Sequence, residues 1–397
     1  MTLAAGPVYF DPFDADIKAN PYAVYRRLRD ETPLYYNDRH DFYLVSRYDD
    51  VLRLLNDRKT FISSKGMQID IIKSGAVTPP GLFVNEDAPQ HTRHRAAVSL
   101  LFNPGHIAEM GKMIRDLCAA TFEPLVGRDN FDLIHEVGAI VPTQVVGMLI
   151  GIPEQDRPKV REQVEASIQK SPEDTQESYA LMAGLYVVFN EYLDWRIEHP
   201  SDDLMTELMN IDFTDDAGTT RRLNRDELLN FLIMIASAGV DTTNMLIGWM
   251  GKRLSDYPDQ RQMLVDDPSA IPNAVEEILR FESPSYHVAR VASKDTEFHG
   301  QVVPEGSCVL GLQGAANRDD RVFENPDSLD VRRTISRTLA FGYGAHHCLG
   351  SALARIEGRI VLEEMLKRFP TWQVDEANAK LTPGYSTRGY ERLPIFV

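Results

Sequence analysis

The residues best suited to chemistry surround Cys348, in the segment Phe341-Gly-Tyr-Gly-Ala-His-His-Cys-Leu-Gly350. Two glycines precede the cysteine and one follows it, directly ahead of a helix predicted from about Leu349 to Phe369. Glycine permits positive φ angles and the close approach of a flat ligand, which a Cβ would obstruct. The partial positive charge at a helix N-terminus lowers the pKa of a nearby thiol and so favours the metal-binding thiolate.

The spacing of the possible ligands argues against zinc and favours a single axial thiolate on haem iron. No second cysteine stands at the interval typical of zinc sites, and the adjacent His346 and His347 are too close for the usual ligand pattern. A lone cysteine thiolate is an established axial ligand of haem iron. Cys118 and Cys308 lack such a loop, and we expect them to be buried structural thiols.

The longest apolar stretch, residues 228–250, carries a second reactive pair. Asp241 and Thr242 lie at its centre, just after Ala238 and Gly239. The glycine removes a side chain, and a helix loosened beside it can admit a small ligand and water. An acid and a hydroxyl side by side in a water-poor site can relay protons from solvent. The alternative is that Thr242 hydrogen-bonds to its own helix, as threonines within helices commonly do.

Composition excludes several classes of protein. The chain has 397 residues, 42 Lys and Arg against 59 Asp and Glu, a net charge of −17 and 43% hydrophobic residues, which suffices for a sizeable core. The acidic balance argues against nucleic acid and anionic membranes, both of which are bound through Lys and Arg. Three cysteines are too few for a secreted disulfide framework, and the N-terminus resembles no signal peptide, so we expect a cytoplasmic protein.

The pattern of apolar residues predicts one domain over residues 1–397, mainly α with minor β. Apolar residues recur at helical spacing in 22–28, 107–125, 137–150 and 179–197, whereas short strands are expected mainly after Arg280, in 287–293, 296–300 and 307–313. Two polar stretches, 172–178 and 212–222, are predicted to be loops. Asp241 would cost about 2.5–3.5 kcal/mol at a bilayer centre. The 228–250 stretch is therefore predicted to be a buried helix.

The cysteine loop and four further motifs in the same order resemble the cytochrome P-450 superfamily, and soluble bacterial members above all. The residues that match its haem-binding loop are Phe341, Gly342, Gly344, His346, Cys348 and Gly350. The resemblance implies the cytochrome P-450 fold, with haem b between the long central helix and the cysteine-loop helix and Cys348 as the iron ligand. Ala238 to Thr243 resembles the family's oxygen-binding groove, which implies that Asp241 and Thr242 deliver protons.

The resemblance also implies roles for several charged residues. His91, Arg95, Arg290 and His346 would bind the haem propionates. Glu277 and Arg280 resemble a structural Glu-x-x-Arg pair that a later arginine completes, and spacing favours Arg333 over Arg332. Arg93 and His94 are interpreted as solvated surface residues or, alternatively, as part of a basic patch that receives an acidic ferredoxin.

The implied reaction is monooxygenation of a small hydrophobic substrate, with O2 and two electrons from a separate ferredoxin and NAD(P)H-dependent reductase. By position relative to the family motifs, the substrate would meet Phe83, Val84, Met234, Ala238, Tyr286, Val288 and Thr387. Three alternatives stay open: a peroxide-using haem-thiolate peroxygenase, a non-enzymatic haem sensor, and a helical scaffold without cofactor. The proton relay argues against the peroxygenase, because peroxide brings its own protons.

Overall fold

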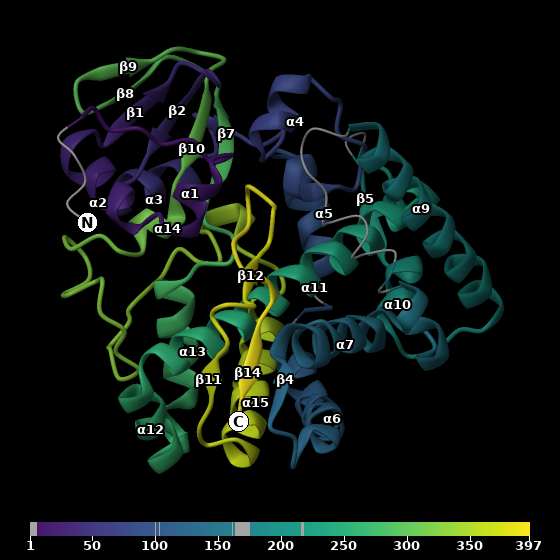
Figure 1. The fold of residues 1–397 in the computed structure, drawn as a ribbon. Coiled ribbons are helices and arrows are strands. Elements are labelled where there is room, and N and C mark those ends of the chain that lie inside the picture. The colour runs from purple at the N-terminus through teal and green to yellow at the C-terminus, as the bar shows by residue number, and fades with distance from the viewer. Residues whose placement is uncertain (1–5, 100, 103, 161, 163–174, 216–217) are drawn as a thin grey trace.

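The computed structural model describes residues 6–99, 101–102, 104–160, 162, 175–215 and 218–397. Helices dominate, and the long helix α11 (Arg225–Asp256) runs through the middle of the molecule (Figure 1). The other α-helices are α1 (Ala15–Ala19), α2 (Tyr22–Glu31), α3 (Tyr48–Asn56), α4 (Ile69–Ser74), α5 (Gln90–Ser99), α6 (Pro104–Phe122), α7 (Ile140–Ile150), α9 (Thr175–Glu198), α10 (Leu204–Asn210), α12 (Pro258–Asp266), α13 (Ile271–Phe281), α14 (Gln313–Ala316) and α15 (Ser351–Arg368).

Shorter helical turns connect these elements. They are η1 (Phe83–Asn85), η2 (Glu123–Leu125), the π-helical η3 (Ile134–Gly138), η4 (Glu154–Asp156), η5 (Pro268–Ala270) and η6 (Gly344–His346). The four helices expected from apolar spacing, α2, α6, α7 and α9, are present, as are the buried helix α11 and the helix α15 after the cysteine loop. The predicted loop at 172–178 lies partly outside the described residues, and its last four residues belong to α9.

The main sheet has five strands in the order β1-β2-β10-β7-β3, at upper left in Figure 1. Strands β1 (Leu34–Asn37), β2 (Phe42–Val45) and β3 (Phe61–Ile62) precede Arg280, and β7 (Val288–Ala292) and β10 (Cys308–Gly311) follow it. The expectation that the strands lie mainly after Arg280 was therefore incomplete. These early strands have four residues or fewer, too short to show a clear alternating pattern.

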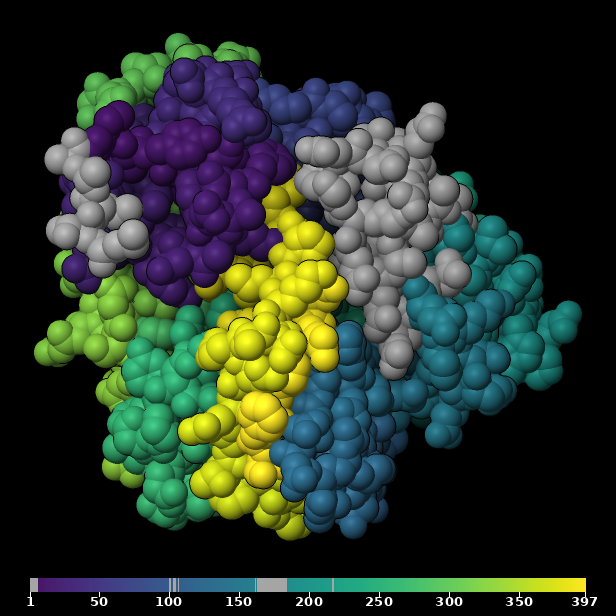
Figure 2. All heavy atoms as spheres, viewed as in Figure 1, coloured from purple at the N-terminus to yellow at the C-terminus, as the bar shows by residue number. Residues whose placement is uncertain are grey.

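The remaining strands form small hairpins and one three-stranded sheet, β11-β14-β4. Their bounds are β4 (Asn130–Asp132), β5 (Asp212–Thr214), β6 (Thr220–Arg222), β8 (Thr296–Phe298), β9 (Gln301–Val303), β11 (Gln373–Val374), β12 (Lys380–Leu381), β13 (Tyr390–Arg392) and β14 (Pro394–Phe396). The stretch 212–222, expected to be a loop, contains the β5–β6 hairpin. In Figure 2 the yellow C-terminal segment runs down the middle of this face, between green atoms on its left and blue atoms on its right, and meets the purple N-terminal region at its upper end.

The core surrounds α11, which packs against α7, α13 and α15. A capping box fixes its start: the Asn224 side chain accepts from the Glu227 N–H, and the Glu227 carboxylate accepts from the Asn224 N–H. Among the described helices, α11 alone is long and apolar enough to span a membrane, but 67% of its most apolar window is buried within the fold. This burial agrees with the prediction, made from the cost of placing Asp241 in a bilayer, that the stretch is a core helix.

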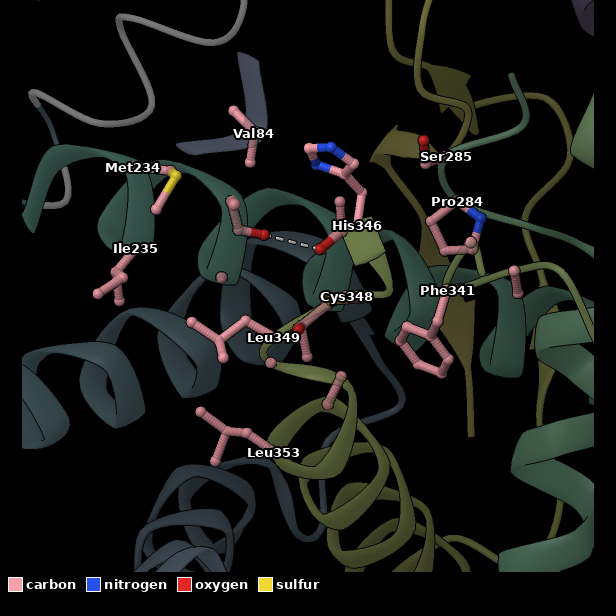
Figure 3. A pocket seen from close by; sticks show the side chains of 18 of the residues that line it. Val84, Met234, Ile235, Pro284, Ser285, Phe341, His346, Cys348, Leu349 and Leu353 are labelled. Atoms are coloured by element: carbon pink, nitrogen blue, oxygen red, sulfur yellow. Dashed lines mark hydrogen bonds between the residues drawn. The ribbon is translucent and has the colours of Figure 1, made fainter. Parts of the chain in front are cut away.

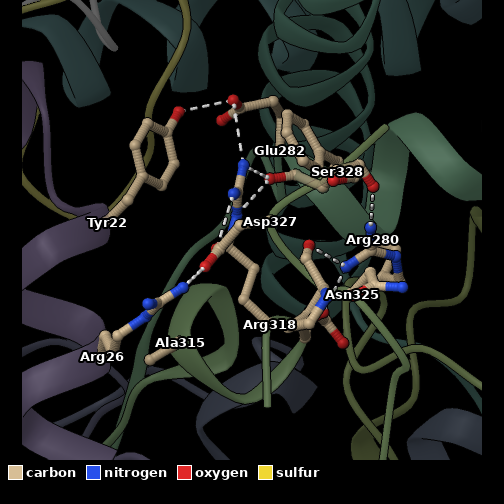
Figure 4. Close-up of polar contacts among 12 residues, drawn as sticks. Tyr22, Arg26, Arg280, Glu282, Ala315, Arg318, Asn325, Asp327 and Ser328 are labelled. Atoms are coloured by element: carbon tan, nitrogen blue, oxygen red, sulfur yellow. Dashed lines mark hydrogen bonds and ion pairs between the residues drawn. The ribbon is translucent and has the colours of Figure 1, made fainter. Parts of the chain in front are cut away.

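A closed polar cluster supports the region below the main sheet. Glu277 and Arg280 are both fully buried and 2.7 Å apart, and the Arg333 side chain lies 3.1 Å from the same carboxylate. Arg332 lies exposed at the surface. Figure 4 shows further polar contacts beside this trio. The Glu282 carboxylate accepts a hydrogen bond from Tyr22 and lies near Arg318. The Asp327 carboxylate forms ion pairs with Arg26 and Arg318.

Candidate active site

The cysteine loop has the backbone that its glycines predicted. Gly342 and Gly344 have φ angles of 69° and 71°, in the left-handed region that disfavours other residues. A Cβ on Gly344 would lie 3.1 Å from the carbonyl oxygen of Leu55 at the end of α3. The Cys348 N–H donates to the Phe341 carbonyl at 2.9 Å, which closes the loop.

The Cys348 side chain faces a cavity of about 300 Å³. The pKa of its thiol is raised and not lowered as expected, because burial outweighs the opposing effects of the Gly350 N–H and the guanidiniums of Arg95 and Arg355. Gly350 also lines the cavity, and a Cβ there would meet no atom within 4 Å. The space above this glycine is therefore open to a ligand lying close to the backbone.

The cavity brings together most of the residues predicted to bind cofactor or substrate. Figure 3 shows Val84, Met234 and Ile235 around the same space as His346 and Cys348. The predicted residues that line it are Phe83, Val84, Arg95, Met234, Ala238, Gly239, Thr242, Val288, Arg290, Phe341, Gly342, His346, Cys348 and Gly350. One wall is thus α11, and the opposite wall is the cysteine loop with the start of α15.

Two arginines and two histidines gather around His346; three of them line the cavity, and His91 lies just outside the lining. Arg290 is only 3% exposed and donates to the Ala289 carbonyl, while Arg95 donates to the His347 carbonyl. Neither guanidinium has a carboxylate partner among the described residues. The His91 and His346 rings lie 4.0 Å apart, and His91 Nε2 is buried without a partner. Burial lowers the pKa of Arg290 to about 10, of His91 to about 4 and of His346 to about 2.

Buried cations without counter-ions are costly unless an anion joins them. The four side chains described above come from α5, β7 and the cysteine loop, which are far apart in the sequence. The two guanidiniums supply positive charge and the two neutral imidazoles supply hydrogen-bonding nitrogens, which together suit a ligand that carries carboxylates, such as the propionates of haem.

Three whole-chain comparisons agree with this geometry. A model of the cytochrome P450 family matches residues 7–386. Cytochrome P450 130 of Mycobacterium tuberculosis is 33% identical over 396 residues, covering 96% of this chain and 95% of that protein. The structure of cytochrome P450 CYP109Q5 from Chondromyces apiculatus aligns with a TM-score of 0.87 at 29% identity, over 98% and 97% of the two chains. The chain belongs to the cytochrome P450 family.

The family assignment confirms the resemblance, the fold class and the class of enzyme. Cytochromes P450 are haem-iron monooxygenases, so this protein is an oxidoreductase. Another structure with the same fold is the bacillaene polyketide synthase cytochrome P450 PksS of Bacillus subtilis, with a TM-score of 0.87 and 28% identity over 98% and 99% of the two chains.

In this P450 the two proposed relay residues are adjacent but differently placed. The Thr242 hydroxyl lines the cavity and donates to the Ala238 carbonyl at 2.8 Å, which is the alternative anticipated for it. Asp241 lies beside the cavity lining, and its carboxyl has no hydrogen-bond partner among the described residues. Burial raises its pKa to about 6. The helix is continuous here, and a Cβ on Gly239 would meet Val146 of α7 at 2.9 Å, so this glycine permits close packing of two helices.

Two predicted substrate contacts lie outside the cavity lining. The Tyr286 ring packs in the N-terminal core with Phe10 and Tyr25, and its hydroxyl donates to the Tyr385 carbonyl. Thr387 pairs through its backbone with Ser285, which does line the cavity. The irregular chain at both sites gives no periodicity from which the side-chain direction could be read.

Sequence reasoning missed a buried acid in this P450. Glu357 of α15 lines the cavity and is 1% exposed, and one of its carboxyl oxygens has no hydrogen-bond partner within the part of the chain that the structure describes. Burial raises its pKa to about 8. A glutamate in a helix is ordinarily solvent-exposed, so its residue type alone does not place it at the cavity. However, Glu357 is four residues after Leu353 and three after Ala354, the spacing of a shared face, and that spacing was the available signal.

The histidine His94 is also placed differently from the expectation. It is 3% exposed and contacts Glu86 and Phe213, so it cannot contribute to a surface patch for a ferredoxin. Arg93, on the other side of α5, is half-buried.

Proposed function

We propose that this cytochrome P450 holds haem b through Cys348 and oxidises a small, mainly apolar substrate with O2. The observation that carries this proposal is the convergence on one cavity of the Cys348 thiol, the unpaired cations Arg95 and Arg290, and the apolar face of α11. Haem b rather than a covalently attached haem is supported by the cysteines. No Cys-x-x-Cys-His segment, which would form the two thioether bonds of c-type haem, occurs in the sequence.

The residues present suit the cofactor. Cys348 would supply the iron ligand, Gly350 leaves its side of the cavity open, and the buried Arg290 and half-buried Arg95 would neutralise the propionates. When bound, haem iron supplies the activation of O2 and the transfer of one oxygen atom to a C–H bond.

The substrate wall is apolar, with few polar handles. Phe83, Val84, Met234 and Val288 supply hydrophobic contacts, and Ser285 supplies a neutral hydroxyl. Such a wall favours a small hydrophobic compound with a limited number of polar groups.

Asp241 and Thr242 would supply protons to this cavity. With a pKa of about 6, the Asp241 carboxyl can both bind and release a proton near neutral pH. The Thr242 hydroxyl proton is engaged with the Ala238 carbonyl, so delivery requires rotation of that hydroxyl toward the cavity. The relay thus depends on a weak intrahelical hydrogen bond that can be exchanged.

Electrons would come from a ferredoxin and an NAD(P)H-dependent reductase. The family match occupies residues 7–386 of these 397 residues, and the three cysteines are too widely separated in the sequence to suggest an iron–sulfur site. We therefore propose that residues 1–397 act as a single haem domain. A cytoplasmic location is proposed from the free cysteines at positions 118, 308 and 348.

The decisive experiment measures product and hydrogen peroxide per NAD(P)H for the wild type, Thr242→Ala and Thr242→Ser. We expect the alanine variant to consume NAD(P)H while releasing peroxide instead of product, and the serine variant to recover product. Equal product from all three would contradict the relay. Full turnover with hydrogen peroxide and no reductase would instead support a peroxygenase. Carbon monoxide binding without turnover by any redox partner would support a haem sensor.

A further inference from the structure

His94 lies where two regions far apart in the sequence meet, residues 79–99 and residues 212–256. Its Nδ1 donates to Glu86 Oε2 at 2.7 Å, and its Nε2 lies 3.7 Å from Glu227 Oε1 at the start of α11. The Phe213 ring of β5 stacks on the imidazole, with centroids 4.7 Å apart and planes at 11°. One buried ring therefore connects residues 79–86, α5, the β5–β6 hairpin and α11.

Glu86 transmits this connection to the turn before η1. Its second carboxylate oxygen accepts from the Gly81 N–H at 2.9 Å. Gly81 has a φ of 90°, and a Cβ there would lie 2.9 Å from the Glu227 Cα, so the turn rests directly on α11. Asn230 of α11 also donates to the Pro80 carbonyl at 2.7 Å. Residues 80–86 are thus held at both ends.

The Glu227 carboxylate is held in place by its own hydrogen bonds. It accepts two hydrogen bonds from Arg221 at 2.8 Å each and caps the N-terminus of α11. Glu227 is thus paired with Arg221 and lies too far from His94 Nε2 for a hydrogen bond, so the carboxylate that His94 binds is Glu86. The charged groups that face the imidazole from the packed segments are Glu86, Glu227 and Arg221.

The segment held in this way forms part of the cavity wall. Phe83 and Val84 line the cavity, and Phe83 packs against Phe231 of α11 at 5.8 Å between centroids. The Arg95 guanidinium lies 5.7 Å from the Phe83 ring centroid and is adjacent in sequence to His94. A displacement of Glu86 would therefore shift both a substrate-facing wall and a cation at the cofactor end.

We propose that His94 is a positioning residue that holds Phe83 and Val84 in the cavity wall through its hydrogen bond to Glu86, and so sets the affinity for substrate. Loss of the Nδ1 donor leaves a buried carboxylate short of one partner. The Glu86 carboxylate is then better solvated if it turns toward water. That movement breaks its hydrogen bond with the Gly81 N–H and weakens the packing of η1. The substrate part of this inference rests on the proposed function, whereas the ordering of residues 79–86 does not.

The test compares His94→Leu, which removes the donor, with His94→Asn, whose amide can occupy the place of Nδ1. Hydrogen exchange of a peptide covering residues 79–86 measures directly how firmly the His94–Glu86 hydrogen bond holds this segment. Binding of 4-phenylimidazole to the holoenzyme, followed by its absorption change, reports the cavity. We expect His94→Leu to speed exchange at Gly81 at least tenfold and to weaken the probe about tenfold. His94→Asn should restore both to within about threefold of the wild type.

His299→Asn is the matched control, because His299 Nε2 pairs with Asp50 at the same 2.7 Å but lies on the β8–β9 turn away from the cavity. It should leave both readouts unchanged. Wild-type exchange and affinity in His94→Leu would overturn the inference, as would His94→Asn behaving like His94→Leu. Failure of the wild type to bind haem would overturn the proposed function but leave the exchange test intact.

Discussion

Two groups of buried arginines in this P450 differ in what surrounds them. Arg280 is fully buried, makes a two-point contact with Glu277 and donates to the carbonyls of Asn317 and Pro326. Arg290 is buried almost as completely but donates only to its neighbour's carbonyl and faces the cavity. The first arginine is fully satisfied by protein groups, whereas no carboxylate of the described residues pairs with the second, which is left for an anion from a ligand.

This difference separates groups that stabilise the fold from groups that bind a ligand. A buried charge in a complete network is expensive to disturb, because the partner left behind loses its compensation. A buried charge without a partner already costs free energy in the unliganded protein, and the ligand recovers that cost on binding. Substitutions in the two groups should therefore have opposite effects on unliganded stability.

The largest effect is expected from Glu277→Gln. Removing this charge leaves Arg280 and Arg333 without their shared carboxylate, which should cost about 3–5 kcal/mol of unfolding free energy. Urea unfolding followed by circular dichroism measures the loss.

Glu276→Gln is the matched control for that substitution. Glu276 pairs with Arg355 through side chains that are 27% and 39% exposed, so its loss should cost no more than about 1 kcal/mol. Equal destabilisation by the two neighbouring substitutions would show that the closed cluster has no special role.

Arg290→Met tests the other side of the comparison. Methionine replaces a buried unpaired cation with an apolar side chain of similar length, so the unliganded protein should be unchanged or stabilised by up to about 4 kcal/mol. Haem retention should fall several-fold, because one counter-charge for the propionates is lost. Thermal unfolding of the haem-free protein and the haem content after dialysis measure these effects. Strong destabilisation of the haem-free variant would mean that Arg290 supports the fold after all.

Glu357 provides the acidic counterpart, an unpaired carboxyl at the cavity. Its pKa is about 8 in the folded chain and near the ordinary 4.5 when unfolded, so between these values the folded state holds a proton that the unfolded state has lost. Stability attributable to this group therefore falls as pH rises from about 4.5 to about 8, by about 1.4 kcal/mol for each unit of pKa difference. Glu357→Gln should remove this slope and be more stable than the wild type at pH 8.

Glu364 of the same helix is the control with the opposite sign. Burial alone would raise its pKa, but hydrogen bonds from Arg368 and Arg115 outweigh that effect and lower it. Its stabilisation is present above the unfolded pKa and is lost as pH falls, so Glu364→Gln should be less stable than the wild type at pH 8. Urea midpoints between pH 5 and 8.5 decide both expectations, and parallel curves for wild type and Glu357→Gln would refute the first.

The sequence was most informative where a regular period or a glycine constrains the chain. Met234, Ala238 and Thr242 recur every four residues on one helix, and all three line the cavity. The positive φ angles of the cysteine loop followed from its glycines. Tyr286 lies in irregular chain, where no period indicates the direction of a side chain. The burial of His94 depends on Glu86 and Glu227 meeting it from other segments, and no local pattern in α5 carries that information.

The smallest effects are expected at two glycines of the cysteine loop, one that the fold requires and one that leaves room for a ligand. Gly344 has a left-handed backbone and lies against the Leu55 carbonyl, so Gly344→Ala should cost about 1–2 kcal/mol in the haem-free protein. Gly350 has an ordinary φ of −81° and faces open space, so Gly350→Ala should change haem-free stability by less than about 0.5 kcal/mol. Because the added methyl group enters the cavity beside Cys348, the same variant should still retain less haem than the wild type. Unimpaired haem retention by Gly350→Ala would show that the cofactor does not lie close to this glycine.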